Sequence, residues 1–291
     1  MKIAITGAKG LLGQELAKTL SSEHEVVCFP GHKEMDLADA SQVRDFVATH
    51  HPDAIIHAAA KRDLDPLETD PESAFHNNCV ATYVVASAAR EFGCSLVHIS
   101  TDAVFPEDRN EAYNEFDEPS LPPTIYGRSK YAAELTVRRA LEKHYIVRLP
   151  WIFGRTGGPE KNFLVNLYAK VRDGKKTVAA SNQLTSVVAS VDAVEAIRRM
   201  VVTPHYGVYH VASPEPVSRA GFLKAALELA GKDTSFVEEK TVAQMNRPAK
   251  RVHYVALRSL LLEPMLGMTV PSWRERLAEI IADLRADGYV D

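Results

Sequence analysis

Three glycines directly follow the first β-rich segment of the chain. Residues 2–6 favour a strand, and Gly7, Gly10 and Gly13 then lead into a segment of helical periodicity at residues 11–20. Gly7 would permit a tight turn, Gly10 would let a phosphate approach the backbone, and Gly13 would let helix and strand pack closely. Because a helix N-terminus attracts anions, this strand, turn and helix predict a dinucleotide-binding site.

The alternation of strands and helices continues to residue 150. Further strands are expected at residues 25–29, 53–60, 95–99 and 145–149, and helices at residues 42–49, 72–91 and 126–142. Asp39 is placed to cap the helix at residues 42–49. Such alternation requires a parallel sheet with helices on both faces, so the predicted fold class is α/β, a Rossmann-like doubly wound parallel sheet. Ligands should bind at the carboxyl ends of its strands.

The pattern loosens after residue 150. Helices are expected at residues 162–172, 191–200, 219–230 and 272–284, separated by loops that contain Pro and Gly. We therefore expect residues 1–150 to form an NAD(P)-binding Rossmann domain. Residues 151–291 should form a smaller, interleaved carboxy-terminal substrate domain, with elements near residues 187–212 returning to the first domain.

Composition excludes several classes of protein. A hydrophobic share of 46% supports a packed core, while a net charge of -4 without basic and aromatic clusters argues against nucleic-acid binding. No apolar run is long enough to cross a membrane and no signal segment precedes the first strand, so a cytoplasmic protein is expected. Three cysteines and eleven histidines show no metal-ligand spacing, and no metal site is expected.

Tyr126 and Lys130 are four residues apart, which places them on one face of the predicted helix. A phenol has an ordinary pKa near ~10 and is poorly matched to proton transfer at neutral pH without a nearby cation. The spacing is common by itself, but here it follows a glycine turn. The combination predicts a proton donor coupled to a dinucleotide site.

These motifs resemble the extended short-chain dehydrogenase/reductase superfamily, and within it the dTDP-4-dehydrorhamnose reductase family of sugar-nucleotide reductases. The resemblance extends along nearly the whole chain through Ser100-Thr101-Asp102-Ala103-Val104-Phe105, Arg148-x-x-Trp151-x-x-Gly154, Asn162-Phe163, Gly207-Val208-Tyr209-His210, Arg247-Pro248 and Pro271-Ser272-Trp273. It implies an NAD(P)H-dependent oxidoreductase that reduces the 4-keto group of a nucleoside-diphosphate 6-deoxysugar, as in dTDP-rhamnose and polysaccharide biosynthesis.

The resemblance also implies roles for individual residues. Thr101 would hydrogen-bond the substrate carbonyl, Tyr126 would donate a proton to it, and Lys130 would bind the nicotinamide ribose and depress the pKa of the phenol. The substrate contacts would be Thr101, Asp102, Trp151 and Arg247. Lys250 and Arg251 follow Arg247 closely and could help it hold a diphosphate, whereas Trp151 could instead be a core residue.

The cofactor residues implied are Gly7, Gly10, Leu11, Leu12, Gly13, His32, Lys33, Asp36, Leu37, Ala58, Ala59, Ala60, Lys61, Ile99, Tyr126 and Lys130. An acidic residue at the end of the second strand would favour NAD, and a basic one would favour NADP. The chain has no carboxylate there until Glu34, so NADP(H) is expected to be preferred, with NAD(H) left open.

Departures from the family pattern leave the sugar open. Ala103 stands where the family has Tyr, Lys61 and Arg62 replace two neutral residues, and residues 182–188 lack the family's Gly and Pro. Two other readings remain: a cofactor-binding regulatory subunit resembling that of methionine adenosyltransferase, and a sugar-nucleotide epimerase or dehydratase. Ala103 argues against a dehydratase, because that position is usually acidic there. The sequence also leaves a homodimer open.

Overall fold

The computed structural model describes residues 1–107, 109–156 and 162–290. Its centre is a six-stranded parallel sheet, which confirms the predicted α/β doubly wound fold. The strands run across the sheet in the order β10 (Gly207–His210), β5 (His144–Leu149), β4 (Ser95–Thr101), β3 (Ala54–His57), β1 (Lys2–Thr6) and β2 (Glu25–Cys28).

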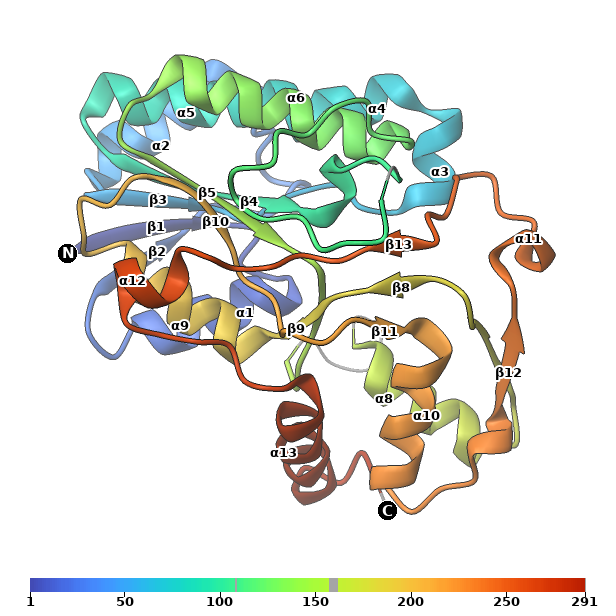
Figure 1. The fold of residues 1–291 in the computed structure, drawn as a ribbon. Coiled ribbons are helices and arrows are strands. Elements are labelled where there is room, and N and C mark those ends of the chain that lie inside the picture. The colour runs from blue at the N-terminus through green and yellow to red at the C-terminus, as the bar shows by residue number, and fades with distance from the viewer. Residues whose placement is uncertain (108, 157–161, 291) are drawn as a thin grey trace.

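Helices cover both faces of this sheet (Figure 1). On one face lie α2 (Ala40–His50), α5 (Ala81–Phe92) and α6 (Ile125–Ala140), and on the other lie α1 (Leu11–Leu20) and α9 (Ser190–Met200). The strands are apolar on both sides, as in Ile3, Ile5 and Ile55, because a parallel sheet is buried on both faces. Asp39 caps α2 as predicted, accepting hydrogen bonds from two backbone N–H groups.

The winding of the sheet reverses beside its first strand. From β1 the chain passes through α1 to β2 on one side, and then crosses to β3 on the other side. Thr6 at the end of β1 is aligned with His57 at the end of β3. In a doubly wound sheet a ligand binds where the strand order reverses, so the segments after Thr6 and His57 should meet it.

The long helix expected at residues 72–91 is interrupted. The structure has α4 (Pro71–Phe75), a π-helical segment η1 (His76–Val80) and then α5. A π-turn inside a helix is uncommon and often marks a functional site. The periodicity of apolar residues could not reveal this π-helical segment, because its wider turn shifts the apolar spacing by only one residue.

The later part of the chain lies beside the carboxyl ends of the sheet (Figure 1). Its strand pairs are β6 (Trp151–Phe153) with β9 (Val187–Ala189), β7 (Thr177–Ala180) with β12 (Val237–Lys240), and β8 (Leu184–Thr185) with both β11 (Val217–Ser218) and β13 (Tyr254–Val255). Helices α8 (Phe163–Arg172), α10 (Arg219–Leu229) and α13 (Trp273–Ala286) pack around an aromatic and aliphatic core. The domain limits stay a prediction, although β10 does pair with β5 of the main sheet.

Short elements complete the fold: α3 (Leu64–Thr69), the 3-10 turns η2 (Asp102–Val104) and η3 (Thr234–Phe236), α11 (Val242–Met245) and α12 (Leu262–Leu266). Within the described ranges, none of the helices combines the length and apolar character needed to span a bilayer.

Candidate active site

The glycine turn joins β1 to α1 and is crowded on two of its three glycines. Gly7 has φ +70°, and a Cβ there would come within 2.8 Å of the Ala58 backbone. A Cβ on Gly13 would lie 2.2 Å from the Gly7 carbonyl oxygen. Gly10 caps α1 and is more open, since the one atom near its added Cβ is the Gly7 oxygen at 3.3 Å. An open glycine at a helix N-terminus fits the backbone approach of a dinucleotide phosphate.

Other predicted cofactor residues lie around this turn. Leu11 and Leu12 begin α1, with Leu12 packed into the core beneath the sheet. Ala58 and Ala59 follow β3, and the Ala59 N–H donates to Thr6 Oγ1 at 3.1 Å. Ala60 is exposed in the same loop. The small side chains of these alanines leave room for a ligand beside the place where the strand order reverses.

The end of the second strand carries an acid that the sequence reading discounted. His32 and Lys33 are exposed in a turn, and Glu34 folds back so that its carboxylate accepts from the Gly31 N–H at 2.8 Å. Lys9 of the glycine turn lies 3.7 Å from the same carboxylate. The Gly31 hydrogen bond and the Lys9 charge lower the pKa of Glu34. Both an acid and bases are therefore available where the adenosine ribose is expected.

Asp36 and Leu37 follow this turn. The Asp36 carboxylate accepts from the Ala38 N–H at 2.9 Å and lies 3.1 Å from His76 Nε2, while Leu37 packs against the core above the sheet.

Thr101, at the end of β4, connects three polar groups. Its hydroxyl donates to Asp102 Oδ1 at 3.0 Å and lies close enough to the Tyr126 side chain on α6 to lower the pKa of that phenol. Asp102 Oδ2 accepts from Thr185 at 2.9 Å. Thr185 belongs to the segment that departs from the family pattern, so that segment is tied directly to the predicted catalytic residues.

Burial dominates the ionisation of this group. It raises the pKa of Asp102 to about 6, against the lowering effect of the Thr185 and Thr101 hydrogen bonds. Burial also raises the pKa of Tyr126 to about 12. The neighbouring Thr101 hydroxyl lowers this pKa, the charge of Asp102 raises it further, and the charge of Arg62 lowers it. The phenol of Tyr126 thus has a raised pKa in this structure, and Arg62 is a cation that lowers it. The expected effect of Lys130 on this pKa stays a prediction.

Lys130 is buried one turn after Tyr126. Its ammonium donates to the Ile99 carbonyl at 2.8 Å and lies 3.3 Å from His98 Nε2. Burial lowers the pKa of Lys130 to about 8, and the Glu134 carboxylate opposes this shift. The group is thus mostly charged at neutral pH and held against β4.

Behind Lys130 lies a buried ion pair. Glu134, one turn further along α6, accepts from Arg148 of β5 at 2.8 and 3.0 Å and from Ser100 Oγ at 2.5 Å. Both side chains of the pair are inaccessible to solvent. The pair connects α6, the end of β4 and β5, the three elements that carry the predicted triad and its support.

Asn78 is a further site residue that the sequence reading missed. It lies in η1, almost fully buried, and its amide oxygen accepts from the Lys61 N–H at 2.8 Å. Its amide nitrogen donates to the Lys61 carbonyl at 2.9 Å and to Ser129 Oγ at 3.0 Å. Asn77-Asn78, two poor helix formers inside a predicted helix, were the available signal. Lys61 itself also bonds Ser73 Oγ at 2.5 Å through its ammonium.

The remaining predicted substrate contacts, Trp151 and Arg247, have different surroundings. Trp151, in β6, packs between Phe163 and Phe222, with Arg219 over its ring. Arg247 is half exposed and lies 3.6 Å from Asp65, which also pairs with Arg251 at 3.0 Å. Trp151 therefore lies partly buried at the edge of the core with Arg219 over its ring, and Arg247 is already partnered by an acid.

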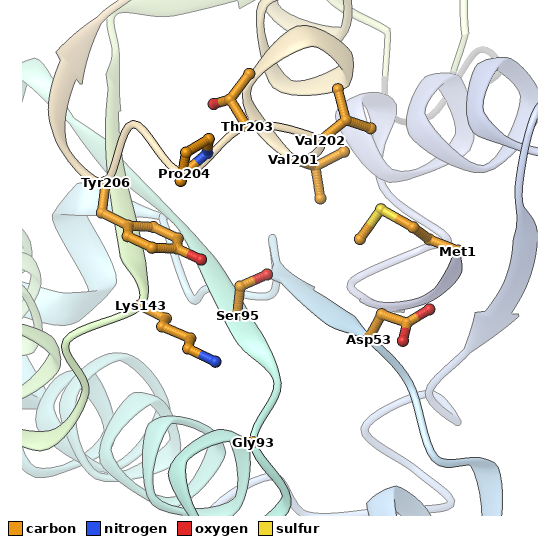
Figure 2. Close-up of a pocket in the computed structure, with 10 residues that line it drawn as sticks. All are labelled: Met1, Asp53, Gly93, Ser95, Lys143, Val201, Val202, Thr203, Pro204 and Tyr206. Atoms are coloured by element: carbon orange, nitrogen blue, oxygen red, sulfur yellow. The ribbon is translucent and has the colours of Figure 1, made fainter.

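A separate hollow of about 350 Å³ lies at the opposite edge of the sheet, between residues that precede or begin its strands (Figure 2). Met1, Asp53, Lys143 and Tyr206 line it, just before β1, β3, β5 and β10. Ligands of doubly wound sheets bind at the carboxyl ends, so this hollow is not the predicted site. In the described part of the chain, no group of three or more His, Cys, Asp or Glu residues is arranged to hold a metal ion.

Comparison with known proteins agrees with this geometry. Residues 1–286 match the family model described as RmlD substrate binding domain. A probable dTDP-4,6-dihydroxy-2-methyloxan-3-one 4-ketoreductase from Streptomyces antibioticus is 32% identical, with 98% of this chain and 96% of that protein covered. The spore coat polysaccharide biosynthesis protein SpsK from Bacillus subtilis is 29% identical, with 97% of each chain covered.

A solved structure is similar over the same length. The crystal structure of dTDP-4-dehydrorhamnose reductase from Bacillus anthracis in complex with NADP superimposes with a TM-score of 0.91. Its sequence is 31% identical, and the match covers 97% of this chain and 99% of that one.

Proposed function

The chain belongs to the RmlD substrate binding domain family, and from this premise we propose that it reduces the 4-keto group of a nucleoside-diphosphate 6-deoxysugar with NAD(P)H. The observation that carries the proposal is the nearness of the Thr101 hydroxyl to the phenol of Tyr126, whose pKa it influences. This pair stands at the carboxyl end of β4, with the ammonium of Lys130 one helical turn away.

The residues of the site would have separate roles in this reaction. Gly7, Gly10 and Gly13 would admit the phosphates of a dinucleotide at the start of α1. When bound, the nicotinamide supplies a hydride to the keto carbon. The Thr101 hydroxyl would hold the substrate oxygen, and Tyr126 would give that oxygen its proton. With its pKa raised to about 12, the phenol is protonated at neutral pH, which is the form that a proton donor needs.

The substrate proposal rests on the family and on the relatives' activities. The dTDP-linked rhamnose precursor is the first candidate, because a relative with 31% identity is a dTDP-4-dehydrorhamnose reductase. A panel of 4-keto sugar nucleotides, with NADPH and the absorbance of the reduced cofactor as the readout, tests it. Oxidation with at least one panel member is expected, and cofactor binding without oxidation of any would favour a binding protein.

Tyr126→Phe provides the matched control for that assay. The variant keeps the aromatic ring and removes the donated proton, so we expect kcat to fall by about 10²–10⁴-fold while NADPH affinity stays within a few-fold. Near-normal steady-state turnover by this variant would eliminate Tyr126 as the proton donor.

We propose NADP(H) as the preferred cofactor, in line with the relative from Bacillus anthracis that was solved with NADP. His32 and Lys33 would receive the 2′-phosphate, with about a ten- to hundredfold advantage over NADH. Glu34 opposes this preference, and Glu34→Gln should increase it further. Dissociation constants for NADPH and NADH in both proteins measure the effect, and tighter NADH binding by the wild type would contradict it.

A further inference from the structure

Arg219 is a cation in an unfavourable place. It is the first residue of α10, where the positive end of the helix dipole disfavours a basic side chain. Its guanidinium carbon lies 3.3 Å from the centre of the Trp151 ring and 5.6 Å from that of Phe163. Throughout the part of the chain that the structure describes, no hydrogen bond or ion pair of this guanidinium is present.

Two further cations approach Arg219 from distant parts of the chain. Burial lowers the pKa of Arg219 to about 9, and the charges of Arg251 and Arg62 add to this effect. Arg62 also lowers the pKa of Tyr126. The exposed side chain of Arg62 is therefore near enough to influence both the predicted proton donor and Arg219.

The acids nearby are occupied by other cations. Asp65 pairs with Arg251 at 3.0 Å and with Arg247 at 3.6 Å, and Glu107 pairs with Lys250 at 3.3 Å. For Arg62, as for Arg219, the described residues include no acidic partner. An anion bound between Arg62 and Arg219 would supply the partner that each guanidinium lacks and would offset the repulsion between their charges.

We propose that Arg219 and Arg62, flanked by Arg251, form the binding site for the diphosphate of the nucleotide sugar beside the face of Trp151. The inference rests on the proposed function and moves the diphosphate from the Arg247 position expected from the sequence. Charge-assisted, bidentate contacts suit arginine and phosphate oxygens. Held there, the diphosphate would leave the sugar on the Arg62 side, toward Thr101 and Tyr126.

Calorimetric titration with dTDP and UDP tests the site without requiring turnover. Saturating NADP⁺ is present throughout, so that the nucleotides do not occupy the cofactor site. Thymidine and uridine serve as ligands that lack the diphosphate. We expect wild-type protein to prefer the diphosphates, and Arg219→Met to weaken dTDP or UDP binding by about ten- to a hundredfold while leaving NADP⁺ affinity within about threefold.

Arg274→Met is the matched control, because Arg274 also lies over a tryptophan, Trp273, at 4.4 Å. It should bind the diphosphates like the wild type. Arg62 is exposed, so Arg62→Ala tests the site with little risk to folding, and a several-fold weakening is expected. Unchanged diphosphate affinity in Arg62→Ala or in a folded Arg219→Met protein overturns the inference. Arginine-dependent diphosphate binding without reduction of any keto sugar would uphold the site and refute the proposed reaction.

Discussion

At the scale of single residues, burial controls the chemistry of the site more than pairwise charge does. The phenol of Tyr126 and the ammonium of Lys130 are shifted in opposite directions, to pKa values of about 12 and about 8, because burial disfavours the charged form of each. Asp102 is shifted in the same sense as Tyr126. Burying ionisable groups in this way lowers the free energy of unfolding, and this loss can be measured.

We expect Asp102→Asn to stabilise the fold at neutral pH. The pKa of Asp102 rises from 3.8 to about 6 on folding. Its contribution to stability is therefore greatest below the unfolded-state value and is lost as the pH rises through 6. Removing the charge should raise the free energy of unfolding by about 1–3 kcal/mol at pH ~7, allowing for imperfect hydrogen bonds to the amide.

The advantage of Asp102→Asn should shrink as the pH falls toward ~4, where the wild-type carboxyl is protonated in the folded state. Urea unfolding of both proteins across this interval measures the difference. A constant difference at every pH would contradict a buried, raised-pKa carboxyl.

At the scale of elements, the π-helical segment η1 carries the side-chain amide of Asn78, which joins parts of the chain on either side of it. Asn78 bonds both backbone groups of Lys61 and the hydroxyl of Ser129, which lies between Tyr126 and Lys130 on α6. The loop after β3, which carries Arg62, is thereby attached to the helix that carries the proton donor. Three elements are held in register through one side chain.

Asn78→Ala should leave the N–H and carbonyl of Lys61 without these partners. We expect a loss of about 1–3 kcal/mol in the free energy of unfolding and faster amide exchange at Lys61, since buried polar groups become unsatisfied. The neighbouring Asn77→Ala is the control, because Asn77 is exposed and, among the residues that the structure describes, its side chain bonds only Ser73 in its own helical turn. Equal effects of the two substitutions would count against the proposed role of Asn78.

At the scale of the whole molecule, acidic side chains of the sheet domain contact the carboxy-terminal segment near the site. Asp65, at the start of α3, accepts from the Ala249 N–H at 3.1 Å and from Arg251 at 3.0 Å. Thr185 contacts Asp102 in the same region. The site is therefore assembled from two parts of the chain, and Asp65 and Asp102 are among the side chains that join them.

Asp65→Ala should loosen the segment that contains Lys250 and Arg251. Trypsin cleaves after Lys and Arg, so we expect cleavage at these two residues to be several-fold faster than in the wild type. Mass spectrometry of the fragments identifies the cleaved bonds. Asp63→Ala is the control, because Asp63 is exposed and its side chain does not cap α3. Identical cleavage of Asp65→Ala and wild type would show that the segment is held by other contacts.

Local sequence determined the sheet, its covering helices and the glycine turn, because apolar periodicity, caps and the freedom of Gly7 act between neighbours in the chain. The position of Tyr126 and Lys130 on one face of α6 likewise followed from their spacing and from helical geometry. Only the tertiary structure decided which groups face one another across the site. Arg62 and Arg251, about 190 residues apart in the chain, both influence Arg219. Asp65 pairs with Arg247 and Arg251, and burial raises the pKa of Tyr126. Those outcomes depend on long-range packing and desolvation, which no local pattern encodes.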